Sequence, residues 1–126
     1  MPVVEIQALP QPGVDTGAVL RTVCVELAEL LDQPAHTVWG IWRPLEAGAY
    51  AEGADAADDQ RRDTHPPLVR VTGYEGRTPE QVERILECVA RVLARELGLG
   101  AGNVFVVFDE VLSGRVFEGG AVVRRD

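Results

Sequence analysis

The chain has 126 residues, and its 12 basic and 20 acidic side chains give a net charge of −8 at pH 7 and a pI near 4.7. This length fits one domain with a real core, and the negative charge disfavours phosphate backbones and anionic lipid surfaces. We therefore expect no nucleic-acid partner and no membrane partner. The start of the chain lacks the basic region and long apolar segment of a secretory signal, which predicts a cytoplasmic protein.

The first predicted element is a strand over residues 3–9. Val4, Ile6 and Ala8 alternate there with Glu5 and Gln7, a period of two that is typical of a strand covered on one side.

A helix is predicted next, with Asp15 or Thr16 as its N-cap and an end near Asp32, before Pro34. Its apolar stripe is expected to be Leu20, Val23, Leu27, Leu30 and Leu31. A second strand is predicted over residues 37–43, followed by a glycine-containing arm over residues 45–53.

The same order of elements then returns. Residues 68–74 read as a strand, and the next helix has Thr78 as N-cap, Pro79 at its first position, Gln81 in a capping box and Gly98 as its stop. A strand over residues 103–111 and a turn-rich arm over residues 113–120 follow. Pro2 and Pro67 are 65 positions apart, so the register of the repeat is nearly constant.

These elements predict an α+β fold made of a tandem β-α-β repeat. The halves span about residues 2–53 and 67–126 of a single domain, and an acidic linker over residues 54–66 joins them. Because a crossover helix joins parallel strands, we expect a four-stranded mixed sheet with two helices on one face. Polar and apolar side chains mix on the other face, which favours its burial in an oligomer.

Cysteine and histidine usage predicts no metal site. Cys24 and Cys88 lie in apolar helical patterns, where cysteine is usually a small, reduced, buried side chain. His36 and His65 stand alone in connecting segments.

The second half carries a family resemblance. The stretch PLVRVTGYEGRTPEQ, from Pro67 to Gln81, resembles the amino-terminal segment of the tautomerase superfamily named for 4-oxalocrotonate tautomerase: a proline, a short strand, Glu-Gly-Arg, a Ser/Thr cap and an acidic-Gln pair. The first half has the terminal proline but shows PQPG where the family has Glu-Gly-Arg. The chain thus resembles a fused member with the proline in one half and the arginine in the other.

The resemblance implies roles for two residues. In the family, an amino-terminal proline freed by loss of the initiator is the general base, which implies this role for Pro2 once Met1 is removed. Arg77, after Glu-Gly, is implied to bind a substrate carboxylate. Pro67 is excluded as a base because its nitrogen is acylated. The resemblance further implies no cofactor and a homotrimer.

Other candidates for the substrate site are weaker. The family's type member has a further arginine on the strand after the helix, and this chain has Trp39 and Phe105 at the corresponding places. Arg43 and Arg70 are possible replacements, although an ion pair or a solvent-facing charge explains them as well. The aromatic side chains expected to line an apolar pocket are Trp39, Trp42, Tyr50, Phe105 and Phe117, with core or interface packing as the alternative, above all for Trp42 and Phe105. Glu110, Arg115 and Glu118 are interpreted as surface charge.

The resulting hypothesis is a cofactor-independent tautomerase that ketonises or isomerises a small enol or unsaturated carboxylic acid. Loss of the second arginine favours a less charged substrate. One alternative is a binding or structural protein that has kept the fold and lost catalysis. Another is a hydratase, dehalogenase or decarboxylase in which protonated Pro2 acts as an acid.

Overall fold

The computed structural model describes residues 1–125, which form two consecutive β-α-β units. The first unit contains β1 (Val3–Ala8), α1 (Thr16–Leu31), a short 3-10 helix η1 (Ala35–Thr37) and β2 (Trp39–Pro44). The second contains β5 (Leu68–Tyr74), α2 (Pro79–Leu97) and β6 (Phe105–Val111). A small hairpin follows each unit: β3 (Tyr50–Glu52) with β4 (Asp55–Ala57), and β7 (Val116–Glu118) with β8 (Ala121–Val123).

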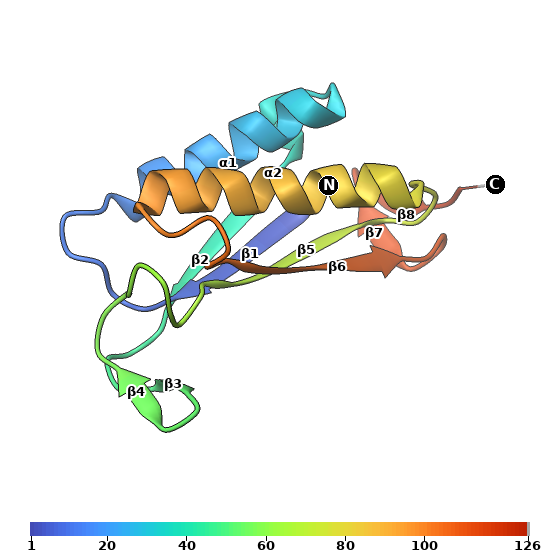
Figure 1. The fold of residues 1–126 in the computed structure, drawn as a ribbon. Helices are drawn as coiled ribbons and strands as arrows, with labels where there is room; N and C mark the ends of the chain where they lie inside the picture. The colour runs from blue at the N-terminus through green and yellow to red at the C-terminus, as the bar shows by residue number, and fades with distance from the viewer. Residues whose placement is uncertain (126) are drawn as a thin grey trace.

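The predicted mixed sheet is confirmed, with strand order β2-β1-β5-β6. β1 runs parallel to β2 and β5 parallel to β6, while β1 and β5 are antiparallel, with Val3 opposite Thr72 and Gln7 opposite Leu68. Both helices cover one face of the sheet (Figure 1). The antiparallel centre places the start of β1, where Pro2 lies, beside the end of β5, which leads toward Arg77.

The hydrophobic core lies between the sheet and the two helices. From the sheet, Val4, Ile6 and Val71 are wholly buried. Helix α1 is capped by Asp15, whose Oδ1 accepts a hydrogen bond from the Ala18 backbone N–H at 3.1 Å. The stripe predicted for α1 is partly wrong, because the helix buries Val19, Val23, Leu27 and Ala28 and leaves Leu30 exposed.

Helix α2 begins with the predicted capping box. Thr78 Oγ1 accepts from the Gln81 N–H at 3.2 Å, and Gln81 Oε1 accepts from the Thr78 N–H at 2.9 Å. This reciprocal pair fixes the angle at which the chain enters the helix. Since Arg77 immediately precedes Thr78, the capping box also fixes the backbone that carries Arg77.

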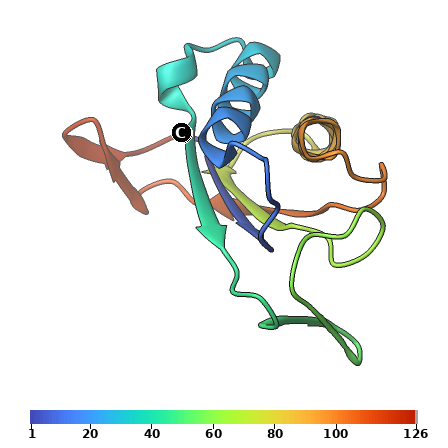
Figure 2. The same ribbon diagram turned by 90° about the vertical axis from the view of Figure 1, so that its left-hand side faces the viewer.

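The two hairpins are equivalent parts of the repeat. Glu52 and Gly53 lie 66 positions before Glu118 and Gly119, and each glycine has a positive φ at the turn of its hairpin. Figure 2 shows the two hairpins extending from the sheet in different directions. Each hairpin follows the outer strand of its own unit and therefore reaches the strand start of the other unit.

The segment predicted as a plain surface linker has more structure than expected. Its residues 55–57 form β4, and its His65 is wholly buried. The buried amide of Asn103 ties the segment down by donating to the backbone carbonyls of Arg61, Arg62 and Thr64 at 2.9–3.1 Å. An amide that binds three partly buried carbonyls compensates for the water that this polar backbone loses.

The face of the sheet opposite the helices is open and partly apolar. Trp39, Ile41 and Phe105 are exposed on it, beside the ion pairs Arg43–Glu5 (3.2 Å) and Arg70–Asp109. An exposed set of large apolar side chains of this kind often marks an interaction surface. Within residues 1–125, no helix combines the length and apolar character needed to cross a membrane.

Candidate active site

Pro2 lies at the start of β1, and its side chain is wholly buried. Its carbonyl accepts a hydrogen bond from the Trp39 N–H at 3.1 Å, as the carbonyl of Pro67 does from the Phe105 N–H at 3.1 Å. The two prolines therefore hold equivalent places in the repeat. They differ chemically in one way: the nitrogen of Pro2 becomes a secondary amine when Met1 is removed, whereas the nitrogen of Pro67 stays in a peptide bond.

Met1 fills the space directly beside Pro2. Its amino group donates to the Thr37 carbonyl at 2.7 Å and lies 3.4 Å from Glu118 Oε1, and its side chain is only 6% exposed. Removal of Met1 would therefore both free the Pro2 nitrogen and open a space about the size of one methionine next to it.

Arg77 comes to the same end of the sheet from the other repeat. Its side chain is half-buried, and its Nη1 donates to the Tyr74 carbonyl at 3.4 Å. Gly73 leaves room for it, because a Cβ there would lie 3.0 Å from Arg77 Nη1 and 2.9 Å from the ring of Phe108. Burial and then the nearby Arg125 lower the pKa of Arg77.

The guanidinium of Arg77 is free to bind an anion. Among residues 1–125, no carboxylate lies within ion-pair distance of it. A guanidinium offers a planar fork of donors that matches a carboxylate in two parallel hydrogen bonds. This end of the sheet thus has a proline from one repeat and, from the other, a guanidinium whose donors suit a carboxylate.

Three further residues at this end were not predicted as part of a site. The Tyr74 hydroxyl donates to Glu118 Oε2, and the guanidinium carbon of Arg125 lies 4.4 Å from the centre of the Tyr74 ring. Burial and then the Glu118 carboxylate raise the pKa of Tyr74 to about 12. The tyrosine therefore stays a hydrogen-bond donor at neutral pH.

The interpretation of Glu118 as surface charge is wrong. Its carboxylate contacts both the amino group of Met1 and the hydroxyl of Tyr74, and the Tyr74 hydrogen bond is the main cause that lowers the pKa of Glu118. Glu118 lies in a hairpin 117 positions from Met1, so no local pattern could reveal the contact. The usable signal was the antiparallel pairing of the repeats, which brings the hairpin after β6 toward the start of β1.

The other predicted site residues divide between the two ends of the sheet. Trp39 begins β2 next to Pro2, and Phe117, which is 72% exposed, lies beside Glu118 in β7. Tyr50 and Phe105 lie at the Pro67 end, where the Tyr50 hydroxyl donates to the Pro66 carbonyl at 2.7 Å. One chain does not bring Tyr50 or Phe105 to Pro2.

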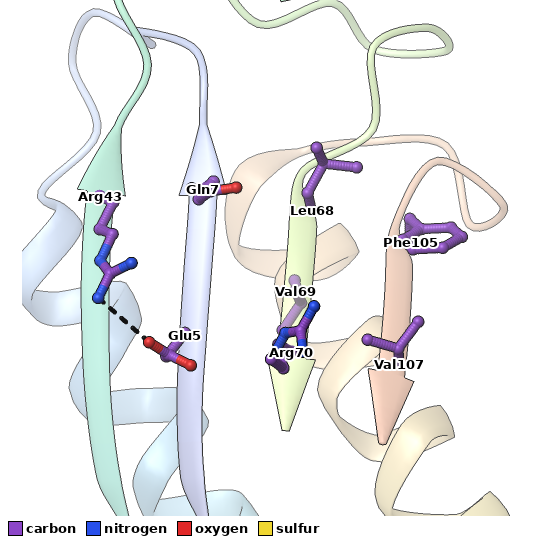
Figure 3. Close-up of a pocket in the computed structure, with 8 residues that line it drawn as sticks. All are labelled: Glu5, Gln7, Arg43, Leu68, Val69, Arg70, Phe105 and Val107. Carbon is purple, nitrogen blue, oxygen red and sulfur yellow. Dashed lines mark ion pairs between the residues drawn. The ribbon is translucent and has the colours of Figure 1, made fainter. Parts of the chain in front are cut away.

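Arg43 and Arg70 are also away from Pro2 within one chain. Both line a hollow of about 390 Å³ on the open sheet face, and Figure 3 shows them there with Glu5 and Phe105. Each is in an ion pair, which is the alternative that the sequence left open. Because this hollow sits among exposed apolar side chains on an open face, we interpret it as part of an interaction surface rather than as the site of proton transfer.

At the Pro67 end of the sheet, Pro67 and the neighbouring His65 are buried. His65 is wholly buried; its backbone N–H donates to Glu52 Oε1 at 3.3 Å, and its ring packs edge-on against Tyr50 at 5.3 Å between centroids. Since the nitrogen of Pro67 is part of a peptide bond, this end has no amine. Within residues 1–125, the candidate site for proton transfer is therefore the one at Pro2.

The sequence of the second repeat matches a known family. Residues 67–125 match the family described as Tautomerase enzyme, and this segment contains both Arg77 and Glu118. No curated protein matches the chain in sequence.

Solved structures match nearly the whole chain. A fused 4-OT described as a symmetric trimer is 16% identical, with 96% of this chain and 94% of that chain covered and a TM-score of 0.79. Pt0534 inactivated by 2-oxo-3-pentynoate is 16% identical, with 96% and 94% covered and a TM-score of 0.78. N1, a member of the cis-3-chloroacrylic acid dehalogenase family, is 20% identical, with 96% and 82% covered and a TM-score of 0.72. At these identities, the likeness is one of fold.

Proposed function

We propose that the chain is a fused-repeat member of the tautomerase superfamily and a cofactor-independent tautomerase acting on a small enol or unsaturated carboxylic acid. Residues 67–125 match the Tautomerase enzyme family, and nearly the whole chain has the fold of a fused 4-OT. The observation that supports the proposal is the antiparallel pairing of β1 with β5, which puts the strand start at Pro2 and the strand end that leads to Arg77 at the same end of the sheet. In the chain that begins at Pro2, this arrangement offers a base beside a carboxylate-binding group.

The proposed reaction transfers one proton and leaves no net change in the protein. The unprotonated Pro2 nitrogen accepts the proton of the enol hydroxyl, the O–H electrons form the carbonyl, and the C=C electrons bond to the proton that the nitrogen returns to carbon. Arg77 holds the substrate carboxylate so that the reacting atoms face the nitrogen. An α-amino group has an ordinary pKa near ~8, and a base of this strength suits proton transfer near neutral pH.

The test is ketonisation of two enol acids, phenylenolpyruvate and 2-hydroxymuconate, by protein whose intact mass shows that Met1 is absent. We expect turnover of at least one substrate without added metal, nucleotide or flavin. Inactivity toward both by protein that begins at Pro2 would contradict the proposed reaction.

A covalent probe tests the amine separately from turnover. Since Pt0534 is inactivated by 2-oxo-3-pentynoate, we propose that this alkyne ketone also reacts here. The Pro2 nitrogen would add to the alkyne carbon remote from the ketone and its proton would pass to the neighbouring carbon, so the protein would gain the mass of the whole reagent. Protein that keeps Met1 has no secondary amine at Pro2 for this addition.

A second candidate function is acid catalysis of water addition or dehalogenation. The position of Glu118 favours it: its carboxylate lies 3.4 Å from the amino group of Met1, and beside a Pro2 amine it would stabilise the cationic form. The pH–rate profile separates the two functions: activity that needs the free amine rises through its pKa, and activity that needs the protonated amine falls.

We propose a homotrimer as the assembly. The open sheet face carries Trp39, Ile41 and Phe105 in exposed positions, and a fused 4-OT of the same fold is described as a trimer. Sedimentation equilibrium should give three times the chain mass of 13.7 kDa. Replacing Ile41 by Glu on this face should shift the protein toward the monomer, whereas Val25→Glu on exposed α1 should not; a wild-type monomer would contradict the assembly.

A further inference from the structure

We propose that Glu118 sets the proton affinity of the Pro2 amine and thereby the pH at which the site becomes active. This inference rests on the proposed role of Pro2 as a free amine, and it makes Glu118 a positioning residue for the proton rather than a group that touches substrate.

The geometry comes from the end of the sheet around Met1. Glu118 Oε1 lies 3.4 Å from the Met1 nitrogen, and the Pro2 nitrogen is three bonds further along the chain. When Met1 is absent, the carboxylate therefore faces the space beside the new terminal amine. An opposite charge within about 4–6 Å favours the charged form of a titrating group.

The carboxylate is held in place on its other side. Glu118 Oε2 accepts from the Tyr74 hydroxyl, and the Tyr74 ring lies under the guanidinium of Arg125. The backbone N–H of Arg125 donates to Ser113 Oγ at 2.6 Å, and Ser113 in turn donates its N–H to the carboxylate of Glu75 at 2.5 Å. These contacts tie the hairpin and the segment after it to the end of β5.

The charged groups around the amine come from several elements and act in opposite directions. Glu118 from β7 favours the protonated amine, while Arg77 before α2 and Arg125 after β8 favour the neutral amine. Tyr74 from β5 stays neutral, and η1 contributes the Thr37 carbonyl, with His36 exposed on it. Among these groups Glu118 is the carboxylate, and its Oε1 lies 3.4 Å from the Met1 nitrogen, three bonds from the nitrogen of Pro2.

The repeat supplies a matched control. Glu52 is the equivalent of Glu118 in the other hairpin, and its carboxylate accepts from the backbone N–H of His65 at 3.3 Å. The group that its carboxylate binds is a backbone amide, and the titratable side chains near it, His65 and Tyr50, lie at the Pro67 end rather than beside Pro2. Glu52→Gln therefore removes the same charge from an equivalent position without touching an amine.

The experiment measures the rate of alkylation by 2-oxo-3-pentynoate against pH, by intact mass, in protein that begins at Pro2. Glu118→Gln should lower the midpoint of the profile by about one unit, the low end of the range for a nearby charge because the Glu118 side chain is 27% exposed. At pH values well below both midpoints, alkylation should become about tenfold faster in this variant. Glu52→Gln should leave the midpoint unchanged.

The midpoint distinguishes this role from a structural one. Loss of a carboxylate near an anionic reagent changes the plateau rate, and partial unfolding lowers the rate at every pH, but neither moves the midpoint. An unchanged midpoint in Glu118→Gln, with an unchanged circular dichroism spectrum, would overturn the inference. A shifted midpoint in protein that turns over no enol acid would support the role of Glu118 while contradicting the proposed reaction.

Discussion

A chain that keeps a residue before Pro2 is expected to turn over enol acids about 10²- to 10⁴-fold more slowly than the chain that begins at Pro2, which is the range contributed by a positioned general base. The lone pair of the acylated Pro2 nitrogen is delocalised into the peptide carbonyl, so this nitrogen is not basic. Met1 also fills the space beside Pro2, since its side chain is 6% exposed. Both effects lower the rate of turnover.

The measurement compares one protein before and after proteolytic removal of a leader that ends directly before Pro2. This comparison keeps the proline ring and changes only what is attached to its nitrogen. Pro67→Ala serves as a control, because it removes a buried proline from the equivalent strand start but leaves the Pro2 amine intact. Equal kcat values before and after leader removal would contradict a role for the amine.

The repeat and the start of α2 could be predicted because local chemistry determines them. The capping box of Thr78 and Gln81 depends on a spacing of three residues, and its two hydrogen bonds are present. The alternation in β1 predicts its buried face equally well, since Val4 and Ile6 are wholly buried. In α1, apolar residues cover more than one stripe, and packing against both α2 and β2 determines which of them are buried.

The candidate site could be predicted only in part, because half of it depends on tertiary contacts. The resemblance singled out Pro2 and Arg77, and the antiparallel pairing of β1 with β5 brings their strand ends together. Glu118 and Arg125 come from the last hairpin and the segment after it. Their position depends on how that hairpin packs against Tyr74, and a sequence of turn residues and scattered charges does not encode this in any local pattern.

Tertiary contacts also explain why the ordered structure of the linker over residues 54–66 could not be predicted. Its composition is polar and acidic, which is typical of solvated segments. However, Asn103 is placed after α2 so that its amide binds three carbonyls of the linker. One buried amide on a distant part of the chain thus turns a stretch of linker composition into ordered structure.

Arg77→Gln is expected to lower kcat/KM for a carboxylate substrate by about 10- to 100-fold, because hydrogen bonds to a charged group contribute about 1.5–3 kcal/mol and each 1.4 kcal/mol is about tenfold. Glutamine keeps one donor but loses the charge and the fork. For the neutral methyl ester of the same substrate, Arg77→Gln should lower kcat/KM much less, since the ester presents no carboxylate to the guanidinium.

The matched control for this prediction is Arg84→Gln. Arg84 is exposed on α2 and borders the same hollow of about 230 Å³ as Arg77, so its loss changes the local field by the same single charge. If Arg77 binds the carboxylate directly, Arg84→Gln should change kcat/KM by less than about threefold, as expected for an exposed and screened charge. Equal losses in both variants, or an equal loss for the acid and its ester in Arg77→Gln, would show that Arg77 acts through the general field or the fold and not as the carboxylate-binding group.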